Sequence, residues 1–122
     1  MITKADPQRR DATGQRAEIM SAWLLRLKGC RILAQRFKTP VGEIDLIEKR
    51  ASAIAFIEVK ARPSAAAAME SVSARQRRWI ARAGLVFMQK RPEFPEYQMR
   101  FDLILVAPGR LPHHISDAWR ES

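Results

Sequence analysis

An acidic β-hairpin is the feature that most constrains what this chain can fold into. Residues 42–48 (GEIDLIE) and 54–60 (IAFIEVK) are rich in β-branched residues and alternate with period two, which is typical of strands. The polar connection at residues 49–52 is short enough to join them as antiparallel neighbours. The pattern therefore predicts a hairpin with acidic residues on both strands.

Two of these acids are expected to face each other. A turn centred near Ala51 places Asp45 roughly opposite Glu58, at the ~5 Å spacing of paired residues, with Glu43 on the Asp45 face. Such carboxylates repel each other, and burial in a sheet adds a desolvation cost that a divalent cation between them would remove. The spacing alone favours a plainer interpretation, a solvent-facing strand surface on which Lys60 pairs with Glu58.

Length and composition limit the chain to one domain. Its 122 residues, 47% of them apolar, suffice for a core, and we expect a flexible basic tail over residues 1–13 before a single domain over 14–122. No apolar run approaches the ~20 residues of a membrane-spanning helix, and the N-terminus lacks the apolar core of a signal peptide. Cys30 is the only cysteine, which excludes intramolecular disulfides and thiolate zinc clusters. We therefore expect a cytoplasmic protein with no membrane partner.

The net charge of +9 is unevenly distributed. Residues 1–38 carry nine lysines and arginines against three acids, and residues 71–91 carry six against none. Residues 39–62, which contain the hairpin, balance four acids with four bases. A basic periphery around a carboxylate-bearing centre suits a polyanion held over a metal site, and a merely solubilising basic surface is the alternative.

The remaining segments predict an α/β fold with the order α-β-β-β-α-β. Its antiparallel hairpin leads through a crossover helix to a further strand in a mixed sheet flanked by helices. Residues 65–68 form either a loop or a weak helix start. We expect helices over residues 15–28 and 72–89 and strands over residues 31–37 and 99–107.

The second predicted helix carries a basic stripe formed by Arg75, Arg78 and Arg82. Like charges spaced three and four residues apart destabilise a helix by tenths of a kcal/mol each, a cost that contacts with phosphates would explain. Gln76 lies on the apolar face of the same helix, where it either caps buried backbone or reaches the acidic site.

Other polar residues near the C-terminus have a plainer expected role. Asp102 lies within the most apolar predicted strand and is expected to be hydrogen-bonded rather than metal-bound. Adjacent residues of a strand point in opposite directions, so His113 and His114 are not expected to share a metal. Ile115 and Trp119 are expected to pack on the core.

Six short motifs occur in order along the chain, and together they resemble the PD-(D/E)xK, or restriction-endonuclease-like, nuclease superfamily. Within it the chain is similar to the YraN-like group (uncharacterised protein family 0102), relatives of archaeal Holliday-junction resolvases. The resemblance covers residues 14 to 119. The motifs are GQRAE at 14–18, GCRIL at 29–33, GEIDLI at 42–47, FIEVKAR at 56–62, Val72 with the basic helix, and RFD at 100–102.

The resemblance implies a restriction-endonuclease-like fold and a set of site residues. It makes Asp45 and Glu58 the metal-binding acids, Lys60 the catalytic lysine, and Glu18 the helix acid that completes the site. Members of the group often carry lysine where Gln76 stands, so this chain lacks a positive charge near the implied phosphate path.

Phosphodiester hydrolysis suits these residue types. Mg²⁺ or Mn²⁺ prefers oxygen ligands, which Asp45, Glu58 and the Val59 carbonyl would supply, with Glu43 contributing through a water. Bound water would then serve as the nucleophile, and Lys60 would orient it or stabilise the charge of the transition state.

The expected function is therefore that of a metal-dependent endonuclease acting on branched or single-stranded DNA in repair or recombination. A nucleic-acid-binding module that is inactive alone and works as a homodimer or in a larger repair complex is the main alternative. A structural protein serving ribosomal or acidic partners is a third. Nucleic-acid contacts are expected from Arg16, Arg62, Arg75, Arg78 and Arg82.

Overall fold

The computed structural model describes residues 12–121, and the side chains of residues 14–121. The predicted basic tail over residues 1–13 lies outside the described residues, except that Ala12 and Thr13 begin the first helix. The elements are α1 (Ala12–Leu27), β1 (Arg31–Thr39), β2 (Gly42–Arg50), β3 (Ala53–Ala61), α2 (Ala65–Glu70), α3 (Ala74–Gln89), β4 (Gln98–Val106) and β5 (His113–Trp119).

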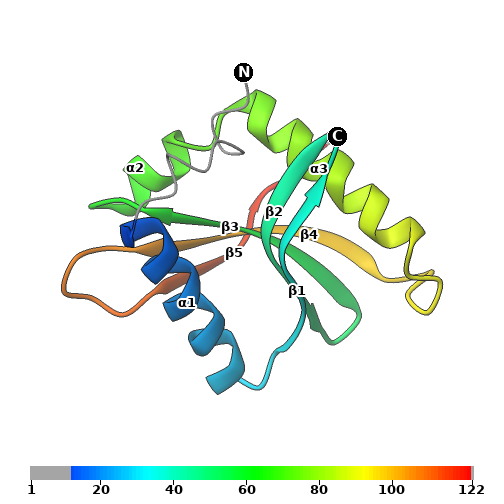
Figure 1. Cartoon of the computed structure of the whole chain (residues 1–122), viewed down its shortest axis with the longest axis horizontal. Coiled ribbons are helices and arrows are strands. Elements are labelled where there is room, and N and C mark those ends of the chain that lie inside the picture. The colour runs from blue at the N-terminus through cyan, green and yellow to red at the C-terminus, as the bar shows by residue number, and fades with distance from the viewer. Residues whose placement is uncertain (1–11, 122) are drawn as a thin grey trace.

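The strands form one mixed sheet in the order β1-β2-β3-β4-β5. Neighbours are antiparallel except for β3 and β4, which are parallel and connected by the crossover through α2 and α3. The helix α1 covers one face, whereas α2 and α3 cover the other (Figure 1). The predicted α/β class with a helix-flanked mixed sheet is confirmed.

Two elements go beyond the predicted order. Residues 65–70 form the helix α2, whose N-terminus is capped by the Ser64 hydroxyl accepting a hydrogen bond from the Ala67 N–H at 3.1 Å. The C-terminal segment forms the strand β5, on which Trp119 is buried and Ile115 packs against the core, as expected. No helix among residues 12–121 is long and apolar enough to cross a membrane.

Each face of the sheet has its own hydrophobic cluster. On the α3 face, Phe56 of β3 packs edge-to-face against Phe87 at a ring distance of 6.0 Å. On the α1 face, Leu25 packs with Ile57 and Leu46. The sheet is therefore buried on both sides, which explains why both hairpin strands are inaccessible along most of their length.

A close approach at Gly42 holds α3 against the start of β2. A Cβ atom on this residue would lie 2.8 Å from the Trp79 carbonyl oxygen, which is closer than side chains tolerate. Because glycine permits this contact, the first turns of α3 lie over the hairpin. This placement brings the N-terminal part of α3 to the acidic residues of β2 and β3.

Candidate functional site

The hairpin has the predicted register, and its ladder ends at the acidic residues. The last residue pair between β2 and β3 is Leu46↔Ile57, so Asp45 and Glu58 are the next positions in register. Ile44 and Ile47 both join the α3-side cluster, although strict alternation would place them on opposite faces. The regular strand geometry is therefore interrupted at Asp45.

Asp45 connects the two strands where the ladder ends. Its side chain is 1% exposed, and its Oδ2 accepts a hydrogen bond from the Val59 N–H at 2.8 Å. The bond fixes one carboxylate oxygen against the β3 backbone at Val59, which lies between Glu58 and Lys60 in the chain. Sequence register therefore predicted the neighbourhood of Asp45 correctly.

Glu58 is fully buried and has partners on two elements. Its Oε2 accepts a hydrogen bond from the Gln76 Nε2 of α3 at 3.0 Å and lies 3.3 Å from the Lys60 Nζ. Of the two alternatives for Gln76, the structure has the one in which it reaches the acidic site. The Lys60–Glu58 pair exists, but the interpretation as a solvent-facing surface was wrong, because Asp45 and Glu58 are both buried.

This burial has an energetic consequence. Removing a carboxylate from water costs several kcal/mol, and a buried ion pair seldom returns more than it costs. Replacing a buried ion pair by a well-packed apolar pair of similar volume is often neutral or stabilising. Buried charges that do not improve stability are found preferentially at functional sites.

The other predicted acids border the same region. Glu43 is buried in β2, two residues before Asp45, and Glu18 is half-buried in α1, which contacts β2 and β3. Within residues 12–121, no three histidine, cysteine or acidic side chains are arranged to hold a metal ion by themselves. Mg²⁺ commonly takes one or two carboxylates and keeps several waters, so Asp45, Glu58 and the Val59 carbonyl suit it.

The predicted basic stripe lies on the outer surface of α3. Arg75, Arg78 and Arg82 are exposed, and the Arg75 guanidinium lies 5.4 Å from the centre of the Trp79 ring. Arg77 differs from them, because its Nε donates to the Val72 carbonyl at 3.2 Å and its guanidinium lies over Trp119. The stripe is therefore available to a ligand, whereas Arg77 has a structural role.

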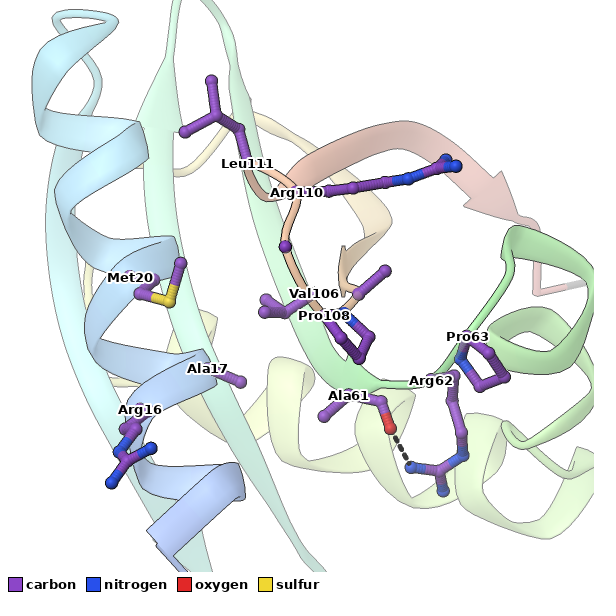
Figure 2. Close-up of a pocket in the computed structure, with 12 residues that line it drawn as sticks. Arg16, Ala17, Met20, Ala61, Arg62, Pro63, Val106, Pro108, Arg110 and Leu111 are labelled. Atoms are coloured by element: carbon purple, nitrogen blue, oxygen red, sulfur yellow. Dashed lines mark hydrogen bonds between the residues drawn. The ribbon is translucent and has the colours of Figure 1, made fainter.

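Sequence reasoning missed a pocket of about 650 Å³ on the α1 side of the sheet. Figure 2 shows it between α1 and the loop that follows β4, with Met20 on one wall and Val106 and Pro108 on the other. Two predicted phosphate contacts, Arg16 and Arg62, line it. The lining also comes from the segment after β4, which no motif marked, so only the fold brings these residues together.

A second buried carboxylate, Asp102, lies between β4 and β5. Arg100 donates two hydrogen bonds to it at 2.9 Å, His114 Nε2 lies 2.8 Å from Oδ2, and the Asp117 N–H donates to Oδ1 at 2.8 Å. Burial favours the neutral acid, but these hydrogen bonds outweigh it and hold the pKa of Asp102 below its ordinary value. The expectation of a hydrogen-bonded aspartate is confirmed, and His113 is exposed while His114 is not.

The fold and site define an α/β protein with a buried carboxylate–lysine cluster at the end of a hairpin. The sequence model of Uncharacterised protein family UPF0102 matches residues 17–106, and the chain belongs to this family, as the YraN-like resemblance predicted. UPF0102 proteins of Parvibaculum lavamentivorans and Chelativorans sp. are 48% and 46% identical, over 88% and 92% of this chain and 80% and 90% of their own lengths. A UPF0102 protein of Paramagnetospirillum magneticum is 44% identical over 98% of both chains.

Proposed function

We propose that this protein is a Mg²⁺- or Mn²⁺-dependent endonuclease of restriction-endonuclease-like architecture, which cuts branched or single-stranded DNA in repair or recombination. One observation carries the proposal. Glu58 is buried, and it lies level with Asp45, one position beyond the last residue pair of β2 and β3. A single oxygen of Glu58, Oε2, contacts both Gln76 of α3 and Lys60. Two carboxylates and an ammonium group gathered at the end of a strand pair suit metal-assisted phosphodiester hydrolysis.

Each protein group has a distinct task in this proposal. Asp45, Glu58 and the Val59 carbonyl would hold the divalent cation, which supplies an activated water and neutralises charge on the phosphate. The hydrogen bond from the Val59 N–H holds the Asp45 carboxylate in place before substrate arrives. Lys60, whose side chain is 14% exposed, reaches from the buried acid toward solvent and would stabilise the developing negative charge.

DNA would be held mainly through its backbone. Arg75, Arg78 and Arg82 are exposed on α3, the helix that also supplies Gln76 to Glu58. Arg16 and Arg62 lie on the other side of the sheet, and Arg62 follows Lys60 by two residues. Such contacts position a duplex without reading its sequence, which agrees with selection by DNA structure.

Cleavage assays test the proposal directly. Purified protein should nick flapped, branched or single-stranded DNA with Mn²⁺ or Mg²⁺ but not with Ca²⁺ or EDTA. Asp45→Ala and Lys60→Ala should abolish cleavage while leaving the circular dichroism spectrum and DNA affinity largely unchanged, and Lys90→Ala, at an exposed lysine, is the matched control. Cleavage that persists in both site variants would refute the assignment.

The alternative of a nucleic-acid-binding module that needs a partner has specific support. Among the described residues no three histidine, cysteine or acidic side chains form a metal-binding cluster, and in this alternative a homodimer partner or a repair complex would supply further ligands. A panel of DNA and RNA structures tested with both metals separates the two functions. Binding without turnover across the panel favours the nucleic-acid-binding module. If calorimetry detects no Mn²⁺ binding that depends on Asp45 and Glu58, the result favours the structural protein.

A further inference from the structure

The pocket on the α1 side has apolar walls surrounded by cations. Met20 projects from α1, and Val106, Pro108 and Leu111 come from the end of β4 and the following loop (Figure 2). Leu111 is 84% exposed and Met20 is 39% exposed, so both leave apolar surface in contact with water. The volume of about 650 Å³ matches pockets that enclose a small organic group.

Three arginines, and no acid among the described residues, line this pocket. Arg16 stands on the α1 wall, whereas Arg62 and Arg110 stand on the opposite side (Figure 2). Arg62 donates one hydrogen bond to the Ala61 carbonyl at 2.9 Å, which leaves most of its N–H groups available. Cations at separate points of a rim suit a ligand with repeated negative charges better than one with a single charged head.

The pocket adjoins the candidate active site along the chain in two places. Ala61, the last residue of β3, and Arg62 directly follow Lys60, and Arg16 and Ala17 directly precede Glu18 on α1. Consecutive residues of a strand point to opposite faces, so Lys60 lies on the face of Glu58 and Gln76, whereas Ala61 lies on the α1 face. A DNA strand with a phosphate at Lys60 would therefore cross the end of β3 to reach the pocket. The stripe on α3 lies across the sheet, so it is a separate contact surface.

We infer that this pocket binds an unstacked base of a single-stranded DNA segment, with the flanking phosphates on Arg16, Arg62 and Arg110. The inference rests on the proposed function, to which it adds how an unpaired strand is selected. Apolar side chains accept a base removed from its stack, whereas a paired base in a double helix remains inaccessible. The pocket thereby distinguishes flaps and single strands from intact duplex.

Binding measurements without metal test the pocket independently of catalysis. Fluorescence anisotropy in EDTA compares a single-stranded oligonucleotide, an abasic oligonucleotide of equal length and a blunt duplex. Leu111→Ser should weaken single-strand binding about tenfold, the equivalent of about 1.4 kcal/mol, because it removes an apolar contact with the base, and should leave the abasic and duplex ligands unaffected. Leu27→Ser is the matched control, since Leu27 is 82% exposed at the far end of α1 and outside the pocket.

An arginine variant tests the phosphate contacts. Arg110→Gln should weaken the base-bearing and abasic oligonucleotides equally, whereas Arg120→Gln, at an exposed arginine outside the pocket, should change neither. Equal affinities of Leu111→Ser and Leu27→Ser for single strands would overturn the inference. It would also fail if Leu111→Ser weakened binding of laurate but of no oligonucleotide, because the pocket would then take a lipid anion.

The outcomes separate this inference from the proposed function. Base-dependent binding that is lost in Leu111→Ser, together with no cleavage under any condition, supports the pocket and refutes the nuclease. Cleavage that depends on Asp45 and Lys60, together with no base-dependent loss in Leu111→Ser, refutes the pocket alone.

Discussion

Two buried carboxylates, Asp102 and Glu58, lie one strand apart and are held in different ways. Asp102 accepts bonds from a backbone N–H, from the Nε and Nη2 of Arg100 and from His114, all within β4 and β5. Glu58 is held through side chains from β3 and α3, at the point where a strand ladder ends. The first arrangement fixes a carboxylate between paired strands, whereas the second uses flexible side chains that can rearrange around a ligand.

The largest expected effect is a loss of stability when the hydrogen-bonded cluster around Asp102 is removed. Asp102→Ala should destabilise the protein by about 3–5 kcal/mol, because it leaves the Arg100 charge without its buried partner. Urea unfolding followed by circular dichroism measures the loss. Glu93→Ala, which removes an exposed ion pair with Arg91, is the control and should leave stability nearly unchanged. A similar loss in both variants would contradict a structural role for Asp102.

A substitution in the cluster of Asp45 and Glu58 should lower the cleavage activity and leave the stability of the protein nearly unchanged. Asp45→Asn keeps an oxygen to accept the Val59 N–H, so the free energy of unfolding should stay within about 1 kcal/mol of wild type. Cleavage should nevertheless fall by about 10²-fold or more, because the amide no longer carries the charge that holds a cation. Urea unfolding and single-turnover cleavage measure the two quantities. An inactive variant that is also strongly destabilised would show that Asp45 serves the fold.

The basic surfaces near the two carboxylates should also differ in how much they contribute to DNA binding. Replacing Arg75, Arg78 and Arg82 with glutamine should flatten the slope of log affinity against log salt by about 2–3 on duplex DNA, since each phosphate contact contributes about 0.9. Arg120→Gln, beside the Asp102 cluster, should leave the slope unchanged. An unchanged slope in the triple variant would move the DNA path to α1 and the tail, with Arg9, Arg10 and Arg16 as the next candidates.

The sequence predicted the site best where local geometry determines it. The short turn sets the register that brings Asp45 level with Glu58, so spacing alone was sufficient. The position of Gln76 could not be predicted, because it depends on the approach of α3 to Gly42. The strand at residues 113–119 and the pocket depend on pairing and packing between distant segments, which no local pattern encodes.

A third buried carboxylate, Glu48, extends the comparison. It is fully buried on β2, and neither oxygen accepts a hydrogen bond from a described residue. The Cys30 thiol lies nearby, where burial and then Glu48 raise its pKa, so it stays protonated and is a weak donor. Glu48→Met should therefore stabilise the protein by about 1 kcal/mol or more in urea unfolding. Destabilisation would mean that the Glu48 carboxylate, like those of Asp102 and Glu58, has polar interactions that stabilise it.

The smallest expected effect is a change in the stability contributed by Asp102 at acid pH. The pKa of Asp102 is lower in the folded protein than in the unfolded chain, so its stabilisation is fully present above the unfolded value of about 3.9. This stabilisation is lost as the pH falls through the pKa of Asp102 in the folded protein, because Asp102 takes up its proton at a higher pH in the unfolded chain. The stability difference between wild type and Asp102→Asn should thus narrow as the pH falls below about 4. Urea unfolding across this range measures the difference, and a difference that does not depend on pH would show that Asp102 has the same pKa in the folded protein and in the unfolded chain.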